Sequence, residues 1–201
     1  AFGLSPLFII PILFGSLWGT ILLIVACAWS GHIFLSRIFE HIAQSFTQAV
    51  DGELDIYTTA RSVSLLIIAS NFFLWHFKVG HITFILYYLA FGILYFTLIS
   101  IKTGLNKSQF IIASLLTWSF YSAGFYHAFI FFLAPIACAA MIWSVPAIYT
   151  AQSQKTLGPL FKQALNPLGF HLLGIVLALY KIIGVINYQQ EMPRVVHNVS
   201  E

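Results

Sequence analysis

One uncharged stretch constrains this chain more than any other feature. From Ser108 to Tyr149 the sequence contains no Asp, Glu, Lys or Arg, and most of its residues are apolar. As a single helix rising about 1.5 Å per residue, this stretch would be roughly 60 Å long, about twice the hydrocarbon thickness of a bilayer. It therefore predicts two membrane spans, divided near the small residues Ser122, Ala123 and Gly124.

The composition also indicates that the chain is surrounded by a lipid bilayer. Of the 201 residues, 60% are hydrophobic and only 7% are charged, whereas about 25% of a soluble domain is charged. A chain of this length cannot hide so much apolar surface in a water-soluble core, so we expect an integral protein of a bacterial inner membrane or an organellar membrane. The net charge of +3 includes no basic patch, which favours the lipid bilayer and other membrane subunits as partners and no nucleic acid.

The apolar runs predict an all-α fold, a polytopic bundle of about six transmembrane helices in one membrane domain comprising residues 1–201. We interpret the opening segment as a span rather than a signal peptide, because it lacks a basic start and continues into further apolar residues. The expected spans are about 6–34, 62–77, 82–101, 108–122, 126–149 and 167–187.

Two amphipathic interfacial segments, 36–61 and 150–166, separate some of these spans. In each, apolar residues recur at helical spacing with polar residues on the other side, which predicts helices lying along a membrane face. Asn166 followed by Pro167 is typical of a helix start, so we expect the last span to begin there. Both segments are candidate docking faces for a partner or a lipid headgroup.

The basic residues predict an orientation. The loops 36–61, 102–107 and 150–166 contain most of the Lys and Arg residues, and the opposite face contains few. Because cytoplasmic loops carry an excess of Lys and Arg, we expect these three loops in the cytoplasm.

No motif in the chain has the spacing of a known active site. The SGH sequence from Ser30 to His32, with SR at Ser36, then His41 and Asp51, resembles parts of the phosphatidic-acid phosphatase motif. The gaps differ from that motif at every step and its basic block is absent, so we assign no family. A membrane hydrolase built on Ser30 to Asp51 is therefore the weakest hypothesis, and the sequence favours a non-catalytic role over an enzyme.

Histidines suggest the alternative function. Two neutral histidines on facing helices at one depth can ligate a b-type haem, and an imidazole within a span marks a candidate site. We name His76, His127 and His171 as candidate ligands of haem b or a metal in a membrane redox protein. No HxxxH or HExxH spacing supports this hypothesis, and the leading interpretation requires no cofactor.

Asn71 and Lys181 are the polar residues expected inside spans. Asn71 is expected to bond to a neighbouring helix. Lys181 lies about two turns from the end of its span, so it either extends to the interface or lines a polar cavity or helix contact. The leading hypothesis is a non-catalytic multi-pass membrane protein, acting as a subunit of a larger assembly or as a small carrier or lipid-handling protein.

Overall fold

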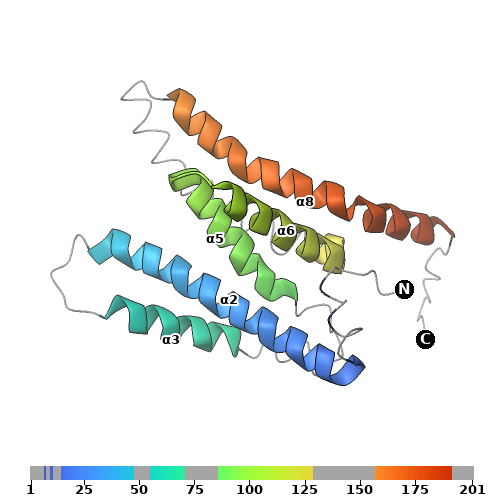
Figure 1. Ribbon diagram of the computed structural model, residues 1–201, viewed down its shortest axis with the longest axis horizontal. Coiled ribbons are helices and arrows are strands. Elements are labelled where there is room, and N and C mark those ends of the chain that lie inside the picture. Colours follow the sequence, from blue (N-terminus) through green and yellow to red (C-terminus); the bar gives the residue numbers. More distant parts are fainter. Residues whose placement is uncertain are drawn as a thin grey trace, which may run out of the picture.

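The computed structural model describes residues 7, 10, 15–47, 55–70, 86–128 and 157–191. All regular structure in these ranges is helical, which confirms the predicted all-α class for the described part of the chain, while the number of spans stays a prediction. The helices, drawn in Figure 1, are α2 (Ser16–Thr47), α3 (Ile56–Ile68), α5 (Leu89–Lys102), α6 (Lys107–Ala128) and α8 (Leu157–Glu191).

The first two helices form an antiparallel pair. Asp55 caps the start of α3, where its carboxylate accepts hydrogen bonds from the backbone amides of Tyr57 and Thr58 at 3.1 and 3.2 Å. At the far end of the pair, Ile68 packs so closely on Gly31 that a Cβ added there would lie 3.2 Å from its side chain. A glycine in α2 thus lets the two backbones approach.

α5 packs alongside α2 and runs parallel to it. The ring of Phe34 on α2 lies 5.6 Å from that of Tyr95 and 5.5 Å from that of Phe96. Near the start of α5, the Tyr88 hydroxyl donates to the carbonyl of Ile68 at 3.1 Å. This bond joins the end of α3 to the start of α5, and both helices also pack on α2.

A short polar turn reverses the chain between α5 and α6. Gly104 adopts a φ of +78°, a left-handed conformation that glycine accepts without strain. Asn106 and Gln109 cap α6 reciprocally: each side-chain oxygen accepts from the other residue's backbone amide at 2.9 Å. The predicted polar loop at 102–107 is therefore a tight turn between antiparallel helices.

α6 and α8 run in the same direction. Phe110 packs against Phe170 with ring centroids 6.4 Å apart, and a Cβ added at Gly174 would lie 2.5 Å from the Thr117 side chain. In Figure 1 the end of α2 and the starts of α3, α6 and α8 all lie at the left of the molecule.

Four expected boundaries differ from the helices found. α2 continues past residue 36 to Thr47, and α3 begins at Ile56 rather than near residue 62. α6 continues through Ser122 and Gly124 to Ala128, and α8 continues through Pro167. Ending a helix leaves up to four amides or four carbonyls without partners, whereas one internal proline removes a single hydrogen bond. Of the described residues in the predicted amphipathic segments 36–61 and 150–166, residues 36–47 continue α2, 56–61 begin α3 and 157–166 begin α8, while their position along a membrane face stays a prediction.

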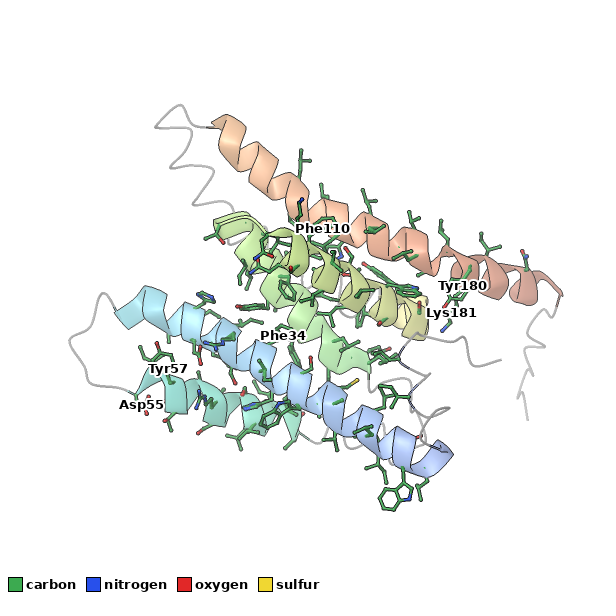
Figure 2. The ribbon with its side chains drawn as sticks, in the orientation of Figure 1. Phe34, Asp55, Tyr57, Phe110, Tyr180 and Lys181 are labelled. Atoms are coloured by element: carbon green, nitrogen blue, oxygen red, sulfur yellow. The ribbon has the colours of Figure 1, made fainter. Side chains whose placement is uncertain are left out.

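The surface and interior of the described part have an unusual polarity. Many large apolar side chains are exposed, including Trp18 at 72% and Leu66 at 74% exposure. Figure 2 shows side chains along the outer edges of α2 and α8. Several hydroxyl side chains are buried beside an apolar core, and those of Thr97, Ser114 and Thr117 donate to the carbonyl four residues earlier in their own helix.

By length and composition, one stretch of described helix, Leu17–Ala43 in α2, is apolar and long enough to cross a membrane. Three other apolar helical stretches are shorter than this, namely Ile56–Ile68, Leu86–Ile101 and Pro167–Lys181.

Candidate functional site: a polar seam between α2 and α3

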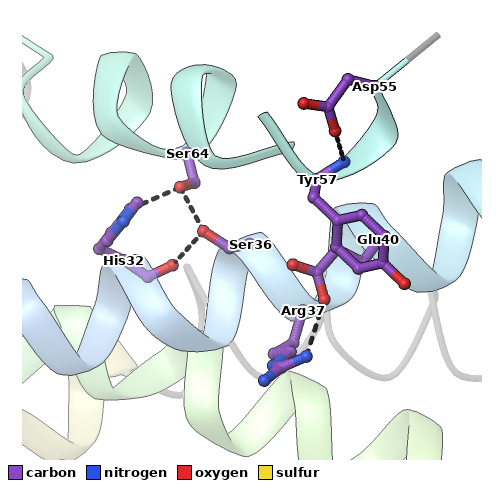
Figure 3. Close-up of polar contacts among 7 residues, drawn as sticks. All are labelled: His32, Ser36, Arg37, Glu40, Asp55, Tyr57 and Ser64. Carbon is purple, nitrogen blue, oxygen red and sulfur yellow. Dashed lines mark hydrogen bonds and ion pairs between the residues drawn. The ribbon is translucent and has the colours of Figure 1, made fainter. Parts of the chain in front are cut away.

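The most concentrated polar cluster of the described residues is a seam between α2 and α3, drawn in Figure 3. At its centre is the Ser64 hydroxyl, which lies 2.6 Å from Nδ1 of His32, 2.7 Å from Oγ of Ser36 and 2.9 Å from the carbonyl oxygen of Arg61. The Ser36 hydroxyl also donates to the carbonyl of His32 at 2.8 Å. Four hydrogen-bonding contacts therefore meet at two serines and one histidine.

Helix geometry brings these groups together. His32 and Ser36 are four residues apart, so they lie on one face of α2. Ser64 is on the face of α3 that packs on α2, between Ala60 and Ile68, and all three of these α3 residues are buried. Because Ser64 has no exposed surface, its hydroxyl depends entirely on these partners.

The number of protons available in the seam indicates whether Nδ1 of His32 carries one. The carbonyl oxygens of His32 and Arg61 can only accept hydrogen bonds. The Ser36 hydroxyl therefore donates its proton to the His32 carbonyl, and the Ser64 hydroxyl donates its proton to the Arg61 carbonyl. If Nδ1 of His32 had no proton, Ser64 would have to choose between the imidazole and the Arg61 carbonyl. A proton on Nδ1 lets the ring donate to Ser64 and satisfies three of the four contacts together. The geometry therefore favours a protonated Nδ1 on His32.

This proton arrangement bears on what the seam can do. A serine nucleophile needs an adjacent base that removes its proton and a substrate that reaches its oxygen. In the favoured arrangement of protons the imidazole donates to Ser64, and the serine oxygen is enclosed between two helices. The seam is therefore better suited to joining α2 and α3 than to hydrolysis. Of the residues in the hydrolase hypothesis, Asp51 lies outside the described residues.

An ion pair extends the seam along α2. Nη1 of Arg37 lies 3.0 Å from Oε2 of Glu40, whose side chain is 7% exposed while that of Arg37 is 58% exposed. The exposed arginine thus compensates a largely buried carboxylate. Glu40 lies within the stretch of α2 that is apolar enough to span a membrane, although the span boundaries expected from the sequence placed it outside.

The three histidines proposed as haem or metal ligands are not brought together by the described residues. His76 lies outside them, as does Asn71, and of His127 only the backbone position on α6 is described. His171 on α8 stacks on Phe170, with ring centroids 4.6 Å apart. Because Phe170 packs on Phe110, His171 and His127 lie roughly 24 Å apart along the helix direction.

A separation of this size does not support one haem held by His127 and His171. Within the ranges that the structure describes, no group of three or more His, Cys, Asp or Glu side chains is placed to hold a metal ion. The haem or metal alternative therefore has no geometric support from these residues.

Lys181 extends from α8 toward α6, as Figure 2 shows. Its ammonium group donates to the backbone carbonyl of Ser122, so the side chain links two helices in the described structure. The side chain of Lys181 is half-buried, and its role in a polar cavity or helix contact stays a prediction.

The chain matches no protein-family model, no curated protein and no solved structure at a significant level. Its function is therefore inferred from its own residues. Sequence patterns had not singled out Ser64, the centre of the seam. The available signal was a hydroxyl residue between Ala60 and Ile68 at helical spacing, the pattern of a face that packs on another helix.

Proposed function

We propose that this chain is a non-catalytic, multi-pass membrane protein that packs as a subunit within a larger membrane assembly. One observation carries the proposal: many large apolar side chains are exposed on the outer faces of the helices, while buried serine and threonine side chains and several glycines lie between helices beside the apolar core. Soluble proteins bury apolar residues and keep most polar ones outside. Helices in a bilayer pack through small and hydroxyl-bearing residues, because lipid chains already solvate apolar side chains.

The relative directions of the helices support several crossings. An alternating path through the six expected spans makes the first and third spans parallel, and likewise the fourth and sixth. In the described helices, α2 runs parallel to α5, and α6 runs parallel to α8. We propose that the span expected at about 126–149 makes the return crossing between α6 and α8.

The positions of basic residues support the orientation expected from the sequence. Lys102 and Lys107 flank the turn between α5 and α6, at the same end of the molecule as the start of α8. We propose that this end faces the cytoplasm.

The hydrogen bonds made by the interior polar groups favour a packing subunit over a carrier. The hydroxyls of Thr97, Ser114 and Thr117 bond to their own helix backbones, and His32, Ser36 and Ser64 bond to one another across α2 and α3. The first three hydroxyls are therefore satisfied within their own helices and the other three side chains join α2 to α3, while the apolar faces of α2 and α8 are left for lipid or for helices of other subunits.

Extraction experiments test the proposal. Membranes from cells expressing the tagged full chain are washed with alkaline carbonate, then solubilised in mild detergent for size analysis and identification of co-purifying proteins. We expect retention in the carbonate pellet and a particle larger than the monomer that contains other membrane proteins. Release by carbonate contradicts membrane embedding, and an isolated monomer with no co-purifying protein contradicts the role as a subunit.

The same purified sample tests the haem alternative. Our proposal predicts an absorption spectrum without a Soret band. A Soret band that disappears in a His171→Ala variant would replace the proposal with a redox function.

A further inference from the structure

The second polar region of the described structure lies between α6 and α8, away from the seam. Lys181 reaches across from α8 and bonds to the carbonyl of Ser122 on α6. An ammonium group carries a positive charge and three hydrogen-bond donors. This region is distinct from the cluster at His32, Ser36 and Ser64 because it is built on different helices.

Two buried polar atoms on residues one turn apart in α6 have no hydrogen-bond partner. The indole nitrogen Nε1 of Trp118 and the hydroxyl oxygen of Ser122 are both buried and unbonded, and Ser122 has no exposed surface. The two residues are four apart and therefore share one face of α6. Because buried polar groups are almost always bonded, two such orphans one turn apart indicate an unfilled site.

The chemistry of these groups defines what fits. The indole N–H can only donate, the ammonium can only donate and is positively charged, and the hydroxyl can donate. A ligand must therefore present several acceptor oxygens with a negative charge, as a phosphate ester or a carboxylate does. Neutral headgroups without accessible acceptors lack this complementarity.

The depth of the region suggests the source of the anion. Ser122 is roughly 22 Å along α6 from Lys107, which flanks the polar turn. In a hydrocarbon core about 30 Å thick, this leaves roughly 8 Å to the opposite boundary. A lysine extended toward that boundary meets the headgroup region of the far leaflet.

We propose that Lys181, Trp118 and Ser122 form a binding site for the anionic phosphate or carboxylate group of a membrane lipid, placed between α6 and α8 near the far leaflet. This inference rests on the proposed membrane embedding and adds a ligand to it. Lys181 supplies the charge, and Trp118 and Ser122 supply neutral donors that orient the oxygens.

Binding to the full chain in mild detergent tests the site. The probes are dioctanoyl phosphatidylglycerol, octanoate and inorganic phosphate, with dioctanoyl phosphatidylcholine as the zwitterionic control, and binding is measured by calorimetry and native mass spectrometry. We expect saturable binding of phosphatidylglycerol that is at least tenfold tighter than that of phosphatidylcholine. Equal affinity for inorganic phosphate would assign the site to a soluble anion and overturn the lipid as its source.

Variants locate the binding. Lys181→Gln is expected to weaken phosphatidylglycerol binding at least tenfold, and Trp118→Phe several-fold because it removes the N–H but keeps an aromatic ring. Lys107→Gln is the matched control: it removes an exposed lysine from the start of α6 and is expected to change affinity less than twofold. If Lys181→Gln does not fold, Trp118→Phe decides, since it leaves the contact between Lys181 and Ser122 in place.

Native affinity in both the Lys181 and Trp118 variants overturns the site, as does the absence of binding by every anionic probe. A chain that remains in carbonate-washed membranes but binds no anion overturns this inference alone. A chain that carbonate releases overturns the proposed function itself.

Discussion

Ser64 illustrates how one small residue can organise a helix contact. Its hydroxyl meets groups from His32, Ser36 and Arg61 at distances between 2.6 and 2.9 Å. A serine is small enough to let two helices approach and still satisfies polar groups that would otherwise be buried without partners. The important property of Ser64 is that its single hydroxyl oxygen takes part in three hydrogen-bonding contacts.

Removing that oxygen should therefore destabilise the contact between α2 and α3. We expect Ser64→Ala to lower the free energy of unfolding by about 1–3 kcal/mol, because it leaves Nδ1 of His32 without its acceptor and the Arg61 carbonyl without the Ser64 donor. Thermal or denaturant unfolding in detergent measures the effect. Ser62→Ala, an exposed serine on the same helix, is the matched control, and equal stability of the two variants would contradict the shared role of Ser64.

The proton count predicts the tautomer of His32. Nitrogen chemical shifts of labelled histidine, assigned with a His32→Gln variant, should show a proton on Nδ1. A neutral ring protonated only on Nε2 would show that Ser64 donates to the ring, and the proposed order of hydrogen bonds would then be wrong.

Asp55 predicts a pH dependence at the start of α3. The hydroxyl and amide of Thr58 bond to its carboxylate and lower its pKa below the ordinary value of 3.8. The charged form is the one that caps the helix, so its contribution is complete above the ordinary pKa and is lost as the pH falls through the lowered pKa. A carbon-13 titration of the carboxyl group should show this lowered pKa, and Thr58→Val should move it back toward the ordinary value.

At the scale of helices, close packing at glycines distinguishes one contact from another. Gly174 on α8 faces Thr117 and the backbone of Trp118 on α6, whereas a Cβ added at Gly184 on the same helix meets nothing within 4 Å. Glycine itself weakens a helix by about 1 kcal/mol relative to alanine. Only the first of these glycines has a packing reason visible in the described structure.

The two glycines form a matched pair for mutation. A Cβ at position 174 would lie 2.5 and 2.7 Å from atoms of Thr117 and 3.0 Å from the amide nitrogen of Trp118. Because a backbone atom is involved, α6 and α8 must separate, and we expect Gly174→Ala to cost about 1–3 kcal/mol. Gly184→Ala should be neutral or slightly stabilising. Comparable unfolding midpoints in detergent would argue against the close approach of α6 and α8.

For the whole molecule, the expected membrane topology depends more on the direction in which each helix runs than on its length. α8 would be roughly 52 Å long as a straight helix, which exceeds the ~30 Å hydrocarbon core. Its start lies at the same end as the turn between α5 and α6, as Figure 1 shows. The turn and the end of α8 are therefore expected on opposite sides of the membrane.

Cysteine labelling tests this topology. In a background without Cys27 and Cys138, Thr103→Cys in the turn and Glu191→Cys at the end of α8 are exposed to a membrane-impermeant thiol reagent in sealed, oriented vesicles. We expect Thr103→Cys to react only from the cytoplasmic side and Glu191→Cys only from the other. Labelling of both from one side would contradict the proposed crossing by α8.

By itself, the sequence determined the helical class and the expectation of a membrane, because low charge and long apolar runs are properties of composition that no packing arrangement changes. Turn chemistry also identified the polar loop at 102–107. The continuity of α2 and α8 was decided by tertiary structure, since local signals such as Asn166 and Pro167 cannot weigh one lost hydrogen bond against the loss of several at a helix end. The seam at Ser64 and the link from Lys181 to Ser122 also needed the structure. Their residues are 32 and 59 positions apart, and only helix packing brings such distant donors and acceptors within hydrogen-bonding range.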